Sequence, residues 1–350
     1  MDPENNFNDI ADSIKTNEPD NARKYFVIAV LIIIFIFLGV VGKKQIYSNE
    51  KNQNILSELP NTFWSYMPSL LSANKEPEKK PITAYDNLSL QAKSACVWDV
   101  QNQKVLFQKN GDLVLPIASI TKLMTTVVAM ENLSKFATVK ISSDNLLSEG
   151  DTGLLNQEKW SLNDLLSFSL TNSSNDGMMA VASTVSSVIN QAGDYSENNF
   201  TRLMNKKAVD MGLSNTRFYN STGLDVDLNL SGGYSTAREI SKLMEYAIQN
   251  YPDIMEATSQ NAAVFSSLSN IKHISKNTNE VVNEIPTIIA SKTGFTDLAG
   301  GTLVVAFDVG LSHPVIATVL GSGRMKRFSD IVQLVQATQK QLLNQQNNVK

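Results

Sequence analysis

Residues 116–130 read PIASITKLMTTVVAM, and this stretch decides the expected fold. Pro116 interrupts the preceding segment. The residues after Ser119 are apolar around most of a helical circumference, so a deeply buried helix is expected over 119–133. Ser119 and Lys122 stand three residues apart and therefore share one face of this helix. The stretch predicts a core helix that begins with a hydroxyl beside an amine.

The segments around this helix predict a domain of mixed α and β structure. Two apolar runs before it, 92–100 and 104–107, are separated by polar residues and predict a β-hairpin. Helices are expected over 162–170, 176–188, 198–211, 237–248 and 327–343, and β-branched strands over 287–295, 301–307 and 314–320. Strands at both ends of a helical middle indicate an α/β (α+β) domain, with an antiparallel sheet, flanking helices and a helical subdomain.

The amino-terminal part carries the signal of a membrane span. Tyr25 to Val41 is a run of 17 apolar or glycine residues with two basic residues on either side. At about 1.5 Å per residue the run nearly matches the hydrocarbon core, so one transmembrane helix is expected over 25–42. A cleaved signal peptide is the alternative, because residues 40–42 resemble a weak cleavage site. Basic residues are equally frequent on both sides, so the orientation must be argued from function.

Composition divides the rest of the chain and excludes several classes of protein. Residues 1–24 form a polar tail, 43–87 resemble a linker, and 88–345 form a globular domain. The net charge of -4, with basic and acidic residues interspersed, predicts no nucleic-acid partner. His273 and His313 lack metal-ligand spacing and Cys96 is the single cysteine, so neither a metal nor another cofactor is expected.

Any hydrolytic chemistry therefore needs a base other than histidine. Lysine can serve if burial or a second cation lowers its pKa. Spacing alone is weakly specific, because Ser-x-x-Lys recurs at 48–51, 72–75 and 269–272, and Ser-x-Asn at 143–145, 161–163 and 196–198. Context selects Ser119, which opens an apolar helix, and Ser173 to Asn175, which lie between two apolar helices. Lys292-Thr293-Gly294 occurs once, on an expected strand, and burial of these polar ends favours one shared cluster.

This ordered trio of motifs resembles the signature of β-lactamases and penicillin-binding proteins. Five longer blocks resemble D-alanyl-D-alanine carboxypeptidases, the low-molecular-weight penicillin-binding proteins. They are 97–100, 116–125, 218–224, 234–239 and 292–300. The resemblance spans residues 81–340, and it implies a β-lactamase/penicillin-binding transpeptidase-like fold for the globular domain.

The resemblance implies a catalytic role for the first two motifs. Ser119 would be the acylated nucleophile and Lys122 its base. Ser173 and Asn175 would form the second wall of the cleft, with Ser173 as a proton relay. The backbone N–H groups of Ser119 and Phe295 would form the oxyanion hole.

The resemblance also implies a substrate-binding role for the third motif. Lys292, Thr293 and Gly294 would bind the terminal carboxylate of the substrate. Arg327 would be a further carboxylate ligand, and a solvated basic face that includes Arg324 and Lys326 is the alternative for this residue. Two segments depart from the family pattern: residues 151–155 replace a Thr-x-Gly-Ser-Ser-like loop, and residue 174 is serine where glycine is common. The first departure concerns substrate preference more than fold.

The implied activity is that of a serine-type D-Ala-D-Ala carboxypeptidase, which removes the terminal D-alanine of peptidoglycan stem peptides and is inhibited covalently by β-lactam antibiotics. A D,D-endopeptidase of the same family is the first alternative. A serine β-lactamase is disfavoured because 210–215 lacks the glutamate of class A enzymes, and a silent peptidoglycan-binding module because every motif side chain is present. Since cell-wall peptides lie outside the membrane, 1–24 is expected to be cytoplasmic, and 43–87 and the catalytic domain 88–345 extracytoplasmic, on a single-pass anchor in the cell membrane.

Overall fold

The computed structural model describes residues 83–147, 149–189, 197–310 and 312–347. The expected cytoplasmic tail, the transmembrane helix over 25–42 and the linker up to residue 82 lie outside these residues. Across the described ranges, no helix combines the length and the apolar character that a membrane span requires. The description below therefore concerns the globular domain.

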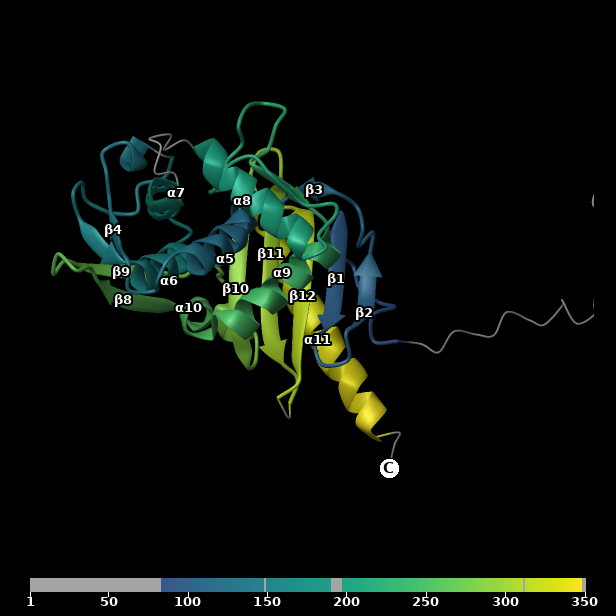
Figure 1. Cartoon of the computed structure of the whole chain (residues 1–350). Helices are drawn as coiled ribbons and strands as arrows, with labels where there is room; N and C mark the ends of the chain where they lie inside the picture. Colours follow the sequence, from purple (N-terminus) through teal and green to yellow (C-terminus); the bar gives the residue numbers. More distant parts are fainter. Residues whose placement is uncertain (1–82, 148, 190–196, 311, 348–350) are drawn as a thin grey trace, which may run out of the picture. The chain divides into compact units, whose positions relative to one another are not determined.

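A five-stranded antiparallel sheet lies at the centre of the domain (Figure 1), in the strand order β10-β11-β12-β1-β2. Its strands are β1 (Ser94–Asp99), β2 (Lys104–Lys109), β10 (Ile288–Thr296), β11 (Gly300–Asp308) and β12 (Pro314–Ser322). Strands β1 and β12 are far apart in sequence but pair directly, with Val97 opposite Ala317. The sheet thus joins both ends of the domain, and β10 and β2 are its two edges.

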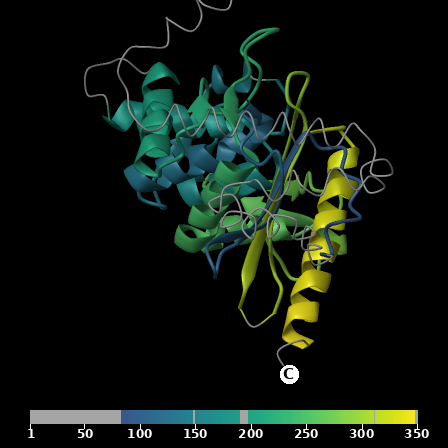
Figure 2. The same ribbon diagram turned by 90° about the vertical axis from the view of Figure 1, so that its right-hand side faces the viewer.

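Successive residues of a strand point to opposite faces, and each face of the sheet has its own apolar cluster. On β11, Val304 and Ala306 join a large cluster shared with most helices, whereas Leu303 and Val305 join a smaller cluster that includes residues of α11 (Lys326–Asn347). Figure 2 shows α11 along one face of the sheet and the other helices on the opposite side. Because both faces are covered, the central strands are buried over almost their whole length, as unbroken β-branched runs predict.

The other α-helices contribute residues to the larger cluster, and several of them form the helical subdomain. They are α5 (Lys122–Asn132), α6 (Leu162–Asn172), α7 (Asn175–Ile189), α8 (Glu197–Asp210), α9 (Ala237–Asn250) and the short α10 (Pro252–Glu256). Helix α5 lies among them and contacts α6, α7, α8 and α9. Its residues 122–129 are all buried, which confirms the core helix expected from the sequence.

Short elements complete the fold. One small sheet has β3 (Leu115–Pro116), β6 (Arg217–Phe218) and β7 (Gly233–Ser235), and two hairpins have β4 (Thr138–Lys140) with β5 (Lys159–Ser161) and β8 (Ala262–Ser266) with β9 (Lys272–Lys276). The 3-10 turns are η3 (Ala118–Thr121), η4 (Asn145–Leu147), η5 (Ala257–Ser259) and η6 (Val282–Glu284). The β8–β9 hairpin was not expected. Its strands alternate exposed residues with more buried ones, a weak signal over five residues.

The expected helices and strands are otherwise present, with two differences in position. The helix expected over 119–133 starts with η3, so Ser119 lies in a 3-10 turn and α-helical geometry begins at Lys122. Residues 83–87, which the sequence places in the linker, pack with the domain. Tyr85 is buried because its ring stacks on Phe107, with centroids 5.1 Å apart, and its hydroxyl donates to Thr338 Oγ1 at 3.1 Å.

Candidate active site

Ser119 lies in the turn η3, which contacts β10 and β11 and leads directly into α5. The preceding residue, Ala118, has a positive φ of 48°, a conformation that costs about 1–2 kcal/mol for a residue with a side chain. The hydroxyl of Thr302 on β11 donates to the Ile117 carbonyl at 3.1 Å and so holds the turn. Backbone strain of this kind persists only where neighbouring contacts fix it, and it is frequent at active sites.

The side-chain amine of Lys122 is enclosed by three oxygen atoms. Its Nζ lies 2.7 Å from each of Ser119 Oγ, Asn175 Oδ1 and the Thr222 carbonyl oxygen. Lys122 is fully buried, and this burial lowers its pKa to about 7. A neutral amine has two N–H donors and one lone pair. The amide and carbonyl oxygens can only accept, so they take both N–H groups and leave the lone pair for the Ser119 hydroxyl proton.

A glycine allows the Thr222 carbonyl to reach Lys122. Gly223 has a φ of +84°, and a Cβ at this position would lie 2.0 Å from the carbonyl oxygen of Ala118. Any larger residue would separate the segment 221–223 from the turn that carries Ser119. The block 218–224 thus supplies one of the three oxygens around the lysine.

Ser173 and Asn175 occupy the junction between α6 and α7. Ser173 ends α6 in a left-handed conformation, with a φ of 64°, and Asn175 is the first residue of α7. The Asn175 side chain faces Lys122 through Oδ1 and donates from Nδ2 to the Glu149 carbonyl at 2.6 Å. Because that carbonyl only accepts, this contact fixes the orientation of the amide.

The loop over 149–155 closes on this junction. Thr152 Oγ1 lies 2.7 Å from Ser174 Oγ, and the Leu154 side chain is buried in the large cluster. Asp176 is buried behind the loop, and its burial, with the nearby charge of Asp151, raises the pKa of Asp176 to about 6. Both departures from the family pattern therefore lie together: Ser174 bonds directly to the replaced loop.

Lys292 brings a second buried amine from the edge strand β10. Its Nζ donates to Ser173 Oγ at 2.8 Å and to the Thr293 carbonyl at 2.8 Å. Burial, followed by repulsion from Lys122 and Arg327, holds the pKa of Lys292 well below its ordinary value. The two buried lysines disfavour each other's charge, so a proton on one favours the neutral form of the other.

Gly294 lets β10 approach the nucleophile. A Cβ at this position would lie 2.4 Å from Thr302 Oγ1 and 2.9 Å from the Ser119 backbone nitrogen. The N–H of Phe295 follows on the same strand. This close approach is compatible with an oxyanion held between two backbone N–H groups. The Phe295 ring is partly exposed, and the Arg324 guanidinium lies 4.9 Å from its centroid.

Arg327 is buried against β10 and does not belong to a solvated face. The residue is 7% exposed, and its Nη1 donates to the Gly294 carbonyl at 2.6 Å. Burial, with repulsion from Arg324, lowers the pKa of Arg327 to about 10, which leaves it protonated at neutral pH. The solvated alternative is therefore wrong for Arg327, although Arg324 and Lys326 are exposed.

The model of the family described as D-alanyl-D-alanine carboxypeptidase (peptidase S11) matches residues 79–323. This chain belongs to that family. The match includes every site residue described above except Arg327, and it makes the chain a serine-type D-Ala-D-Ala peptidase family hydrolase.

Curated relatives include both branches of this peptidase family. The D-alanyl-D-alanine endopeptidase of Pseudomonas aeruginosa is 31% identical over 81% of this chain and 87% of its own length. The D-alanyl-D-alanine carboxypeptidase DacF of Bacillus subtilis is also 31% identical, over 68% of this chain and 59% of its own length. Both peptidase types are therefore similar to this chain at the same level of identity.

A solved penicillin-binding protein of the same fold has a bound antibiotic. Penicillin-binding protein D2 from Listeria monocytogenes, in its ampicillin-bound form, is 30% identical and matches with a TM-score of 0.57. The match covers 72% of this chain and 98% of that protein. The peptidase domain described here thus has the penicillin-binding, transpeptidase-like α/β fold.

Other matches to the motif spacings in this peptidase lie away from the cluster. Ser269 and Lys272 belong to the turn and second strand of the β8–β9 hairpin, and Ser161 caps α6. Asn145 is bonded to Ser142. Two further Ser-x-Asn matches, 259–261 and 275–277, lie in the turn η5 and at the end of β9. The matches at 48–51, 72–75 and 196–198 have serines outside the described residues. Among the described candidates, only the predicted trio shares one site.

The two histidines of the peptidase are hydrogen-bonded to buried carboxylates elsewhere. His273 Nε2 lies 2.7 Å from Glu158 Oε1, and His313 Nε2 lies 2.7 Å from Asp99 Oδ1. Neither histidine contacts Ser119 or Lys122. Their environment is that of structural partners for buried carboxylates.

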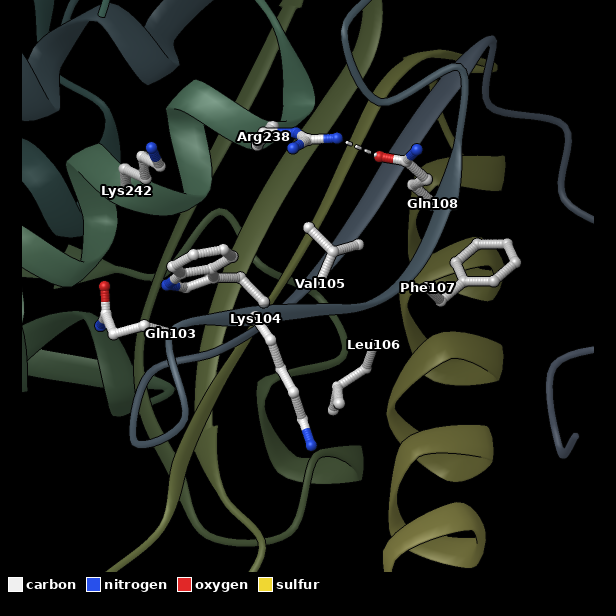
Figure 3. Close-up of a pocket in the computed structure, with 9 residues that line it drawn as sticks. Gln103, Lys104, Val105, Leu106, Phe107, Gln108, Arg238 and Lys242 are labelled. Atoms are coloured by element: carbon white, nitrogen blue, oxygen red, sulfur yellow. Dashed lines mark hydrogen bonds between the residues drawn. The ribbon is translucent and has the colours of Figure 1, made fainter. Parts of the chain in front are cut away.

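A groove of about 610 Å³ lies between β2 and α9 (Figure 3), and it is separate from this site. Its lining includes Trp98, Val105, Arg238 and Lys242. Figure 3 shows Arg238 bonded to Gln108 across the groove, at 2.6 Å. None of the peptidase motif residues lines it.

Sequence reasoning missed three groups of the peptidase site. They are the carbonyls of Thr222 and Glu149, which orient Lys122 and Asn175, and the hydroxyl of Thr278, which lies 2.5 Å from Thr293 Oγ1. A backbone carbonyl leaves no trace in residue identity. The resemblance of block 218–224 to the family was the only available signal for Thr222.

Proposed function

We propose that this chain is a D-Ala-D-Ala carboxypeptidase that removes the terminal D-alanine of peptidoglycan stem peptides through a Ser119 acyl-enzyme. The observation that carries the proposal is the environment of Lys122. Its amine is buried with a lowered pKa, and two obligate acceptors leave its lone pair for the Ser119 hydroxyl. This arrangement activates a serine without histidine.

In the acylation step, Ser119 Oγ attacks the carbonyl carbon of the penultimate D-alanine and its proton passes to Lys122 Nζ. The N–H groups of Ser119 and Phe295 stabilise the developing oxyanion. The C–N bond then breaks, and the departing nitrogen takes the proton from Lys122 with Ser173 as the relay. Free D-alanine leaves, and water attacks the Ser119 ester while Lys122 accepts its proton. The ester C–O bond breaks, and Lys122 returns that proton to Ser119 Oγ.

The substrate carboxylate couples the protonation states of Lys292 and Lys122. A carboxylate bound by Lys292, Thr293 and Arg327 favours the protonated form of Lys292. A charged Lys292 in turn favours the neutral form of Lys122, because both amines are buried. Binding of the correct substrate therefore prepares the base.

Amidation of the substrate tests this role of the carboxylate. Charge-assisted hydrogen bonds contribute about 1.5–3 kcal/mol each, and amidation removes the charge. We expect kcat/KM for a peptide amide to be lower by about one to three orders of magnitude than for the free acid. Equal values for acid and amide on the wild-type enzyme would contradict carboxylate recognition by Lys292 and Thr293.

D,D-endopeptidase activity is the second candidate, and the similarity to the Pseudomonas aeruginosa endopeptidase supports it. The two activities share the acyl-enzyme and differ in the size of the leaving group. Product analysis on a stem pentapeptide and on a cross-linked dimer separates them. Release of D-alanine from the pentapeptide, with the dimer cleaved at least tenfold more slowly (about 1.4 kcal/mol), would support the carboxypeptidase.

The same site explains why β-lactams are expected as covalent inhibitors, since the Listeria monocytogenes protein is known with ampicillin bound.

For the whole chain, we propose a cytoplasmic tail over 1–24, a single span over 25–42 and an extracytoplasmic catalytic domain. Protease added to intact spheroplasts should digest that domain. Its complete protection would reverse the proposed orientation.

A further inference from the structure

Thr278 belongs to none of the three motifs, yet it contacts one of them directly. It lies in the segment between β9 and η6, and its Oγ1 is 2.5 Å from Thr293 Oγ1 of the Lys-Thr-Gly motif. Thr293 is 3% exposed, and Thr278 is half-buried. A second hydroxyl therefore lies behind the hydroxyl proposed to bind the substrate.

The backbone of Thr278 is fixed by both of its neighbours. The Asn277 side-chain amide donates to the carbonyls of Thr258 and Gln260, each at 2.8 Å. The Asn279 N–H donates to Asn277 Oδ1 at 2.8 Å, and both asparagines are buried. The backbone that carries Thr278 is thus held on both sides by hydrogen bonds of buried neighbours.

The same residue also contacts the opposite wall of the site. The Thr278 N–H donates to the Thr171 carbonyl at 3.2 Å, in the last turn of α6 and two residues before Ser173. Thr278 therefore connects the end of α6, which carries Ser173, to the middle of β10, which carries Thr293. It is placed to hold these two walls at a constant separation.

The direction of the hydrogen bond between Thr278 and Thr293 decides whether Thr293 can donate to a substrate carboxylate. Each threonine hydroxyl has one proton to donate and two lone pairs that accept. If Thr293 donates to Thr278, it has no proton left for a substrate carboxylate. If Thr278 donates to Thr293, the Thr293 proton is free for the carboxylate, and the accepted bond makes Thr293 a better donor.

We propose that Thr278 is a positioning residue for substrate recognition, which donates to Thr293 and so directs the Thr293 proton to the terminal carboxylate. This inference rests on the proposed carboxypeptidase function. It adds a second threonine to the carboxylate subsite and assigns it a task that the motif cannot perform alone. Because an anion is the stronger acceptor, this pair of hydroxyls favours a free carboxylate over an uncharged terminus.

The test compares Thr278→Val, which removes the hydroxyl and keeps the branched shape, with Thr278→Ser, which keeps the hydroxyl. Thr184→Val is the matched control, because Thr184 is also half-buried and its hydroxyl bonds the Ala180 carbonyl on α7, away from the site. For each variant, kcat and KM are measured on a free-acid peptide and on its amide. The ratio of the two kcat/KM values is internal to each variant, so partial misfolding cancels.

We expect Thr278→Val to lower kcat/KM for the acid about fivefold to thirtyfold, mainly through KM, and the amide by less than about threefold. Thr278→Ser should restore the acid-to-amide ratio to within about threefold of wild type. Thr184→Val should leave that ratio unchanged. An unchanged ratio in Thr278→Val, with both peptides slowed alike, would show a purely structural role and overturn the proposal.

A double-mutant cycle tests whether Thr278 acts through Thr293. If Thr278 acts through Thr293, then Thr278→Val should not change the ratio further when Thr293→Val is already present. Independent, additive losses would also overturn the proposal. Measurements on the wild-type enzyme distinguish failure of this inference from failure of the proposed function. If the wild-type enzyme cleaves no D-Ala-D-Ala peptide, the proposed function is refuted. If it cleaves normally and Thr278→Val leaves the acid-to-amide ratio of kcat/KM unchanged, only the role of Thr278 is refuted.

Discussion

The two edge strands of the sheet, β10 and β2, each pair with one neighbouring strand but have opposite surroundings. Residues 290–294 of β10 are buried although the strand has only one paired neighbour, because η3 and η5 stand against it. No residue of β2 is buried, and both of its ends carry lysines, Lys104 and Lys109. The pairings of both edge strands contain a register shift, so this irregularity does not distinguish them.

The difference lies in how firmly the polar side chains of each edge strand are held. On β10, buried polar groups are bonded to residues of facing elements, as Lys292 is to Ser173, so each holds a fixed position. On β2, the lysines at both ends disfavour pairing with another chain. On β10, a second layer formed by η3 and η5 therefore buries an edge strand and fixes its polar side chains.

Removing the base should produce the largest effect on activity. We expect Lys122→Ala to lower the rate of acylation by a fluorescent penicillin by about a thousandfold or more, because no other base contacts Ser119 among the described residues. Circular dichroism should show a retained fold. Acylation at more than a tenth of the wild-type rate would show that another group activates Ser119.

The pH dependence of acylation should produce the next largest effect. Lys122 acts as a base only when unprotonated, and burial lowers its pKa to about 7. The acylation rate should therefore rise with pH up to about 7 and fall about tenfold per unit below it. Stopped-flow acylation between pH 5 and 9 measures this profile. A rate independent of pH from 5 to 7 would contradict the assignment.

A buried polar pair away from the β10 edge should affect stability and not chemistry. His273→Ala leaves Glu158, whose side chain is fully buried, without one partner, and should lower the free energy of unfolding by about 1–3 kcal/mol. Acylation should stay within about twofold of wild type. Urea unfolding and penicillin labelling measure the two quantities. Loss of acylation with unchanged stability would make the histidine catalytic.

The smallest effect is expected at the β2 edge. Lys104→Gln removes a charge from the groove of Figure 3, which none of the motif residues lines. Peptide kcat/KM and the melting temperature should both match wild type within error, since isolated surface changes contribute about 0.5 kcal/mol or less. A change of more than about threefold in kcat/KM would show that the two edges are coupled.

Much of the fold could be predicted from the sequence because its elements are long and strongly periodic. The apolar circumference of 119–133 and the β-branched runs after residue 287 both determine burial locally, and both predictions are confirmed. The β8–β9 hairpin could not be predicted, because its five-residue strands rest on one side only.

The site was predictable only where side-chain identity carries the chemistry. Ser119, Lys122 and Asn175 follow from motifs and are joined by hydrogen bonds to the Lys122 amine, while Ser173 is bonded to Lys292. The Thr222 carbonyl depends on the close approach that Gly223 permits, which is a tertiary property. The burial of Arg327 likewise depends on how α11 packs on β11 and β12, which brings Arg327 to the Gly294 carbonyl of β10, so the sequence left two interpretations open.

The central claim is that Ser119 forms the acyl-enzyme, and mapping the site of a covalent adduct tests it most directly. The protein is incubated with ampicillin, digested, and examined by mass spectrometry. The account predicts the intact mass of the antibiotic on the peptide that contains Ser119, and no adduct in folded Ser119→Ala. An adduct on any other residue, or none on folded wild-type protein, would contradict it.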